Sequence, residues 1–164
     1  MKRLIVYVHG KGGSAQEAEH YKSLFPKDEV IGFDYRSQTP WQAKKEFFAF
    51  FTEQRGRCEH LTLVANSIGA FFALSSLDET LVDRAYFISP ILDMENLICN
   101  MMQWSNVTEQ ELALTSIETV SAFAKLHHAD LTVIPGGEHW FHTDEQMQFL
   151  DKWIRERSLN DVCG

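Results

Sequence analysis

The chain has 164 residues, about the length of one domain of roughly 150 residues, so we expect residues 1–164 to form a single domain. Hydrophobic residues make up 45% and charged residues 23% of the sequence, a globular composition that excludes a disordered chain and a disulfide-stapled miniprotein. The formal net charge of −8 repels phosphate backbones and anionic membrane surfaces. We therefore expect neither nucleic acid nor a membrane as a partner.

The cysteines and the N-terminal residues bear on the cellular compartment. Cys58, Cys99 and Cys163 are odd in number and lack CxxC spacing, which is typical of free thiols in a reducing compartment. Lys2-Arg3 before an apolar run resembles the start of a signal peptide, but the run stops at His9-Gly10 without a small-residue cleavage site. These features predict a cytoplasmic protein whose chain begins with a strand.

Short β-branched and apolar runs alternate with longer amphipathic segments, a pattern typical of a parallel sheet covered by helices on both faces. The predicted strands, buried on both sides, are Leu4–Val8, Val30–Asp34, Leu61–Ala65, Ala85–Ser89 and Leu131–Ile134. The predicted helices are Ala15–Leu24, Pro40–Gln54, Ser67–Leu77, Ser116–His127 and Thr143–Arg157. We thus expect an α/β fold with a mostly parallel sheet of about five strands.

Three local details follow from side-chain spacing. Phe47, Phe48 and Phe51 are expected to share one buried helical stripe. Thr143 with Gln146 three residues later predicts a capping box at the start of the last helix. Residues Asp93–Thr115 lack a clean strand or helix pattern, and we interpret them as an irregular helical excursion over the carboxyl ends of the strands.

The pentapeptide Ala65–Gly69 lies where a predicted buried strand turns directly into a helix. Such a turn can force a serine into a strained conformation that exposes its hydroxyl above the sheet, with small residues two positions before and after it. The amide of Ile68 would then point toward developing negative charge at the helix N-terminus. Ser67 is therefore a candidate nucleophile; a simple serine N-cap is the alternative.

Two further loops belong to the same edge of the predicted sheet. The glycine-rich loop His9–Ser14 follows the first strand, where it could form half an oxyanion hole, a plain turn or a phosphate-binding loop. It matches neither the P-loop nor the G-x-G-x-x-G pattern, which disfavours nucleotide binding. The loop Gly136–His142 follows the last predicted strand and places His139 where a general base could reach Ser67.

The histidines of the second loop have other interpretations. His139 and His142 could be ordinary surface residues, or they could bind a metal as an H-x-x-H pair with His127 and His128. No further ligand of suitable spacing accompanies them, so we predict no metal and no cofactor.

The order of these motifs, a glycine-rich loop, a serine at a strand-to-helix turn and a histidine after the last strand, resembles the α/β-hydrolase superfamily. The chain looks most like its small bacterial serine hydrolases and esterases, whose motifs His-Gly-x-Gly-Gly-Ser and Gly-Gly-x-His-x-Phe match His9–Ser14 and Gly136–Phe141. The resemblance implies that Ser67 is the nucleophile and His139 the base, with the backbone amides of Lys11 and Ile68 as the oxyanion hole. His142 is then the less favoured base.

The sequence departs from that family at the triad acid. Family members usually carry a further strand, ending in a Gly-x-x-Asp-like turn, before the last strand and helix, and this chain has none. Asp93, three residues beyond Pro90, is the first candidate for the acid, with a helix N-cap as its alternative role. Glu138 is a weaker candidate because neighbouring loop side chains tend to diverge.

These observations predict a serine hydrolase acting on small carboxylic esters through an acyl-serine intermediate. The segment Leu97–Val107, rich in Met and Trp, would form an adaptable apolar wall over the site. The alternatives are a non-catalytic binding protein of the same fold that lacks a complete triad, and a nucleotide-binding protein that uses the loop Gly10–Gly13. The oligomeric state is not predicted.

Overall fold

A computed structural model of the chain describes residues 2–92, 117–137, 139 and 141–159. Within them a single parallel sheet has the strand order β2-β1-β3-β4. Its strands are β1 (Arg3–Val8), β2 (Glu29–Phe33), β3 (His60–Asn66) and β4 (Arg84–Ile88). Val8 is aligned with Phe33 and with Ala65, and Asn66 with Ile88, so the carboxyl ends of all four strands meet at one edge.

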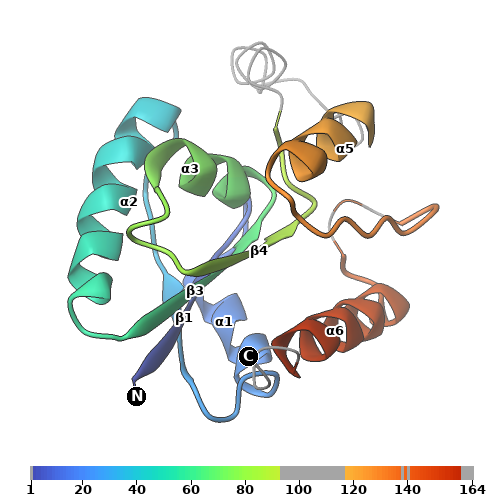
Figure 1. Ribbon diagram of the computed structural model, residues 1–164, viewed down its shortest axis with the longest axis horizontal. Coiled ribbons are helices and arrows are strands. Elements are labelled where there is room, and N and C mark those ends of the chain that lie inside the picture. The colour runs from blue at the N-terminus through green and yellow to red at the C-terminus, as the bar shows by residue number, and fades with distance from the viewer. Residues whose placement is uncertain (1, 93–116, 138, 140, 160–164) are drawn as a thin grey trace.

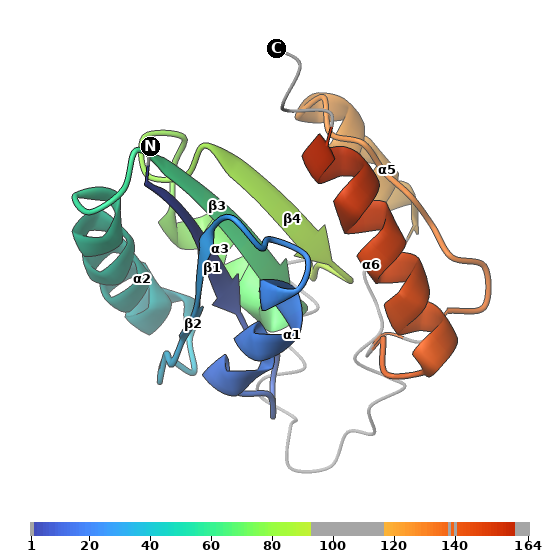
Figure 2. The same cartoon turned by 90° about the horizontal axis from the view of Figure 1, so that it is seen from below.

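Helices cover both faces of this sheet (Figures 1 and 2). One face packs against α2 (Pro40–Arg55) and α3 (Ile68–Ser76), and the other against α1 (Ala18–Lys22) and α6 (Asp144–Leu159). A 3-10 turn, η1 (Ala15–Glu17), precedes α1, and α5 (Ile117–Leu126) lies with α6 at the β4 side of the sheet. The predicted α/β architecture, a reduced α/β-hydrolase-like fold, is confirmed.

The central strand explains why the chain folds this way. Residues Leu4–Val8 of β1 are at most 2% exposed, because β1 has a strand on either side and a helical layer on each face. A run of consecutive apolar residues suits this position, since both faces of the strand are buried. Phe47 and Phe51 of α2 are fully buried against the same layer, and burial of each ring contributes about 1.5–3 kcal/mol.

The predicted fifth strand, Leu131–Ile134, is wrong: these residues form no strand, and β4 is the edge of the described sheet. Leu131 and Val133 are 41% and 52% exposed. An apolar, β-branched run indicates a capacity for pairing, but a strand forms only where a neighbouring strand supplies its hydrogen bonds. The segment does not pair with β4, and a cavity described below lies between them.

Two smaller expectations also need correction. Phe48 is 52% exposed, because consecutive residues on a helix point about 100° apart, and it does not share the buried stripe of Phe47 and Phe51. At the start of α6 the Gln146 N–H donates to Thr143 Oγ1 at 3.3 Å, as expected, but the buried Gln146 Oε1 has no hydrogen-bond partner. The reciprocal half of the predicted capping box is therefore missing.

Some predictions concern residues outside the described part of the chain, namely the excursion Asp93–Thr115 and the apolar wall Leu97–Val107. Among the helices that the structure describes, none is both long and apolar enough to cross a bilayer.

Candidate active site

Ser67 occupies a sharp turn between β3 and α3. Its backbone has φ 52° and ψ −119°, in the positive-φ region that residues with a Cβ seldom adopt and that costs of the order of 1–3 kcal/mol. The Ser67 N–H donates to the Ile88 carbonyl of β4 at 2.9 Å, which ties the turn to the neighbouring strand. The turn therefore holds the Ser67 side chain between the sheet and α3. Ser67 is 5% exposed.

The small residues around this turn are required by close packing. A Cβ placed on Gly69 would lie 2.4 Å from the His9 carbonyl oxygen and 2.9 Å from Val8 Cγ1. A Cβ on Gly10 would lie 3.2 Å from the Cβ of Ser67. Glycine at position 69 thus lets α3 approach the end of β1, and glycine at position 10 lets the loop after β1 lie against the serine.

His139 reaches Ser67 from the loop that precedes α6. Its Nε2 lies 2.8 Å from Ser67 Oγ, a hydrogen-bonding distance between residues 72 positions apart in the sequence. Burial lowers the pKa of His139 below its ordinary value of 6.5, because desolvation penalises the charged imidazolium. The ring is therefore predominantly neutral at pH 7 and can accept the hydroxyl proton.

The loop His9–Ser14 sits beside this pair with its backbone fixed at both ends. At its start the Tyr35 hydroxyl donates to the His9 carbonyl at 2.9 Å, and the two rings stack with centroids 4.3 Å apart. At its end the Ser14 N–H donates to Glu17 Oε1 at 2.9 Å. Tyr35 could not be found from the sequence, because an aromatic residue after the second strand carries no local signal for a contact with a loop 26 positions earlier.

The predicted oxyanion-hole amides belong to the residue after Ser67 and to the loop that lies against it. Ile68 is the first residue of α3, and the N–H of a first helical residue has no acceptor inside its own helix. Lys11 follows Gly10 in the loop that lies against the serine. The helix N-terminus carries partial positive charge, which favours an anion at this place.

The remaining candidates stand apart from the pair or outside the described residues. His142 is exposed, and the structure places His139, not His142, against Ser67. Asp93 and Glu138, the candidate acids, lie outside the described residues. Within the part of the chain that the structure describes, no group of three or more His, Cys, Asp or Glu side chains could hold a metal ion.

A cavity of about 630 Å³ opens at His139. Ser89, Pro90 and Ile91, which follow β4, line it together with His139 and Phe141. The histidine therefore borders a space large enough for a small organic molecule.

Compared by sequence, the chain matches no protein-family model and no curated protein. Compared by structure, it is similar to a carboxylesterase from Mesorhizobium loti, with a TM-score of 0.64 and 14% identity over 94% of this chain and 88% of that one. It is also similar to an uncharacterized protein from Bacillus cereus ATCC 10987, with a TM-score of 0.62, 18% identity and 94% of this chain covered, but only 60% of that protein. At these identities the likeness concerns the fold alone, which is an esterase- or hydrolase-like α/β fold.

Proposed function

We propose that the chain is a serine hydrolase of small carboxylic esters, with Ser67 as the nucleophile and His139 as the general base. The observation that carries this proposal is the 2.8 Å contact between Ser67 Oγ and His139 Nε2 at a strained strand-to-helix turn. A serine that only caps a helix needs neither positive φ nor a buried imidazole on its hydroxyl. The fold of the carboxylesterase from Mesorhizobium loti is compatible with this chemistry.

In the first half of the reaction, Ser67 Oγ attacks the ester carbonyl carbon while His139 Nε2 takes the hydroxyl proton. The carbonyl electron pair moves to its oxygen, where the backbone N–H groups of Ile68 and Lys11 stabilise the negative charge. A single donor of this kind contributes about 10²–10³-fold in rate. When the tetrahedral intermediate collapses, the bond to the alcohol oxygen breaks, and the alcohol leaves with the proton from His139.

In the second half, water replaces the alcohol. His139 takes a proton from the attacking water, whose oxygen bonds to the acyl carbon. As this second intermediate collapses, the bond to Ser67 Oγ breaks, and Oγ regains its proton from His139. The carboxylic acid is released, so that one ester and one water have become one acid and one alcohol.

Asp93 is the proposed acid, which would orient His139 and stabilise its charged form. Ser89–Ile91, which ends two positions before Asp93, lines the same cavity as His139. Loss of such a carboxylate lowers turnover by about 10⁴ in a serine protease. Asp93→Asn should therefore depress ester hydrolysis by several powers of ten, whereas an aspartate that only caps a helix would leave the rate nearly unchanged, because Asn caps about as well.

Labelling with a fluorophosphonate followed by intact-mass analysis tests the nucleophile. We expect one adduct on the unmodified protein and none on Ser67→Ala. Ser75 lies in α3, the helix that follows Ser67, and Ser75→Ala is the matched control that should label normally. His139→Ala should abolish labelling and His142→Ala should spare it. Labelling that survives Ser67→Ala would contradict the proposal, and absence of both labelling and ester hydrolysis in the unmodified protein would favour the non-catalytic binding protein.

A further inference from the structure

The cavity beside His139 continues along the free edge of β4. One wall is Arg84–Ile91, and the opposite wall is Leu131–Ile134. Residues of α5, among them Val120 and Phe123, line it on one side, and residues of α6, among them Leu150, line it on the other. We call this space the β4 slot: it lies in continuation of the sheet, between two helical layers, at the edge where Figures 1 and 2 show α5 and α6.

The β4 wall offers backbone hydrogen-bonding groups. Ile88 is bonded toward β3, since its carbonyl accepts the Ser67 N–H. Successive residues of a parallel strand turn their N–H and C=O groups to alternate sides, so Ala85 and Phe87 turn theirs away from β3. In the described part of the chain β4 pairs with β3 alone, and these groups of Ala85 and Phe87 have no strand to bond. An unpaired edge of this kind is a template for another strand.

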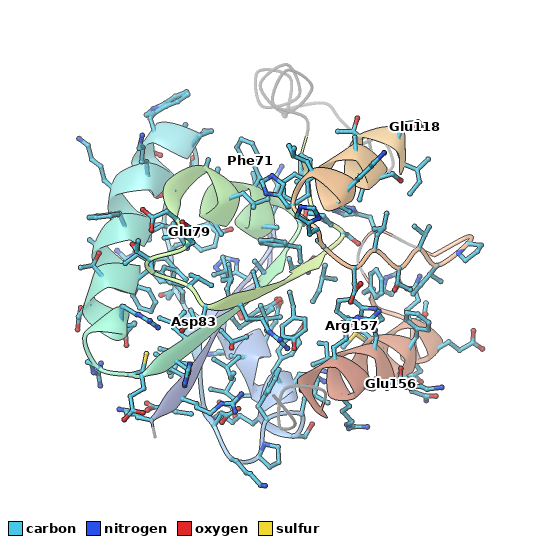
Figure 3. The ribbon with its side chains drawn as sticks, viewed as in Figure 1. Phe71, Glu79, Asp83, Glu118, Glu156 and Arg157 are labelled. Atoms are coloured by element: carbon cyan, nitrogen blue, oxygen red, sulfur yellow. The ribbon has the colours of Figure 1, made fainter. Side chains whose placement is uncertain are left out.

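The opposite wall is held in place by α6. Thr132 Oγ1 accepts a hydrogen bond from Trp153 Nε1 at 2.9 Å and another from Arg157 Nη2 at 3.4 Å. Figure 3 labels Arg157 on α6. Leu150 and Ile154, on the same helix, are buried in the core against the sheet. The segment 131–134 is thus fixed at a distance from β4 without pairing to it.

The slot is lined by apolar side chains that stay exposed among the described residues. Ile117, Leu131, Val133 and Phe149 all line it, and each is at least 40% exposed. They make up four of the seven exposed large hydrophobic residues among those described, and such clustering marks an interaction site. Because they come from α5, α6 and the wall between them, an occupant should carry apolar side chains on both of its faces.

The end of the slot away from His139 carries the guanidinium of Arg157, and Asp130 lines the same cavity without forming an ion pair with it among the described residues. Arg157 lines the slot there, and its Nε is buried without a hydrogen-bond partner. Among the described residues no carboxylate lies within salt-bridge distance of it; its neighbours are the Trp153 ring, 4.2 Å from Cζ, and Thr132. A buried guanidinium N–H without an acceptor is costly, so this end favours an acidic group.

We propose that the β4 slot binds an extended peptide segment of a partner protein as an additional strand, with apolar side chains on both faces and an acidic side chain at Arg157. Edge N–H and C=O groups suit a peptide, whereas a hydrocarbon chain would leave them unsatisfied. The five residues of β4 span about 13 Å at 3.3 Å per step, so about five residues of peptide pair with it. This binding activity goes beyond the proposed ester hydrolysis and does not depend on it.

Fluorescence anisotropy with a fluorescein-labelled peptide of sequence Glu-Val-Thr-Val-Ile-Val tests the proposal. We expect saturable binding. Binding should weaken at least ~10-fold when alternate peptide amides are N-methylated, because the peptide edge that faces β4 then loses several hydrogen bonds. Replacing the Glu of the peptide by Gln should weaken binding by a similar factor. Absence of saturable binding, or equal binding of the N-methylated peptide, overturns the proposal.

Protein variants locate the site. Arg157→Gln should weaken peptide binding ~10-fold and remove the preference for Glu over Gln, while Arg155→Gln, at an exposed position of the same helix, should change neither. Ala85→Pro removes an edge N–H without touching the β3 side, and it should abolish binding where Ala85→Ser keeps it. Unchanged binding by Ala85→Pro and Arg157→Gln together would refute the slot as the site.

Two more arms separate this proposal from others. Ser67→Ala should bind the peptide as well as the unmodified protein does, so loss of hydrolysis and loss of peptide binding remain distinguishable. Dodecanoate is the competing occupant, a simple acyl chain. If it displaces the peptide and binds Ala85→Pro as tightly as the unmodified protein, the slot holds acyl chains and the peptide proposal is wrong.

Discussion

Gly69→Ala probes the close approach on which the turn at Ser67 depends. The added Cβ would lie 2.4 Å from the His9 carbonyl oxygen, and the two atoms must separate by at least 0.6 Å to reach the 3.0 Å below which real contacts are essentially never seen. Overpacking of this kind costs about 1–3 kcal/mol. Ala gains up to about 1 kcal/mol over Gly inside a helix, and less at the second position of α3. We expect a net loss of about 1–2 kcal/mol in the free energy of unfolding.

Thermal unfolding and fluorophosphonate labelling measure the two consequences. A domain of this size loses about 2–4 °C of Tm per kcal/mol, which predicts a fall of about 2–8 °C. A shift of α3 by a good part of an ångström should also slow labelling by up to about 10², since a displacement of about 1 Å has that effect on oriented groups. Gly56→Ala is the control: its Cβ would meet nothing closer than 3.5 Å, its φ is −66°, and we expect unchanged or higher stability. Unchanged unfolding and labelling in Gly69→Ala would refute the argument.

Three other measurements test the site, the loop beside it and an ion pair of the fold. Ester hydrolysis (kcat/KM) should rise with pH to a plateau with a midpoint below 6.5, because burial lowers the pKa of His139; a midpoint at or above 6.5 would contradict this. Tyr35→Phe leaves the His9 carbonyl without its donor and should cost about 1–3 kcal/mol in urea unfolding and slow fluorophosphonate labelling, whereas an effect on neither would show that the loop is fixed elsewhere. Burial, the largest single influence, raises the pKa of Asp83, but the hydrogen bonds from Arg55 and from the Leu61 N–H, together with the charge of Arg55, outweigh it and hold the pKa below its ordinary value. The stability that this ion pair contributes is present above the unfolded pKa of about 3.9 and is lost as pH falls through the lower folded pKa. For this partly exposed pair the contribution to the free energy of unfolding is less than about 1 kcal/mol. Asp83→Asn should therefore flatten the acid side of a plot of Tm against pH.

The sequence predicts well those elements whose environment is written in their own residues. Leu4–Val8 of β1 is an unbroken apolar run and Leu61–Ala65 of β3 is interrupted only by Thr62, because both faces of these strands are buried; α2 begins at Pro40 after the N-cap Thr39. The segment Leu131–Ile134 has a similar composition but pairs with no strand in the described part of the chain. Its pairing depends on another part of the molecule, and composition alone does not contain that information.

The same distinction holds within the site. Ser67 could be predicted because the strand, the serine and Gly69 are adjacent in sequence. The placement of His139 assumed that a parallel strand at Leu131–Ile134 ends at the same edge of the sheet as the other strands. That strand does not form, yet the segment still brings His139 Nε2 to 2.8 Å from Ser67 Oγ. Tyr35 could not be predicted, since its role rests on a stacking contact and a hydrogen bond to His9 that only the folded chain creates.

Different elements hold Ser67 and His139 in position. Ser67 is part of the sheet, tied to β4 through its N–H and bounded by two glycine contacts that leave little room for movement. His139 belongs to the loop between the wall of the β4 slot and α6, and that wall is held by hydrogen bonds from α6 to Thr132. Packing of α6 on the sheet through Leu150 and Ile154 therefore sets the position of His139 relative to Ser67. Changes in the slot or under α6 should alter the proposed ester hydrolysis through His139, without disturbing the turn that holds Ser67.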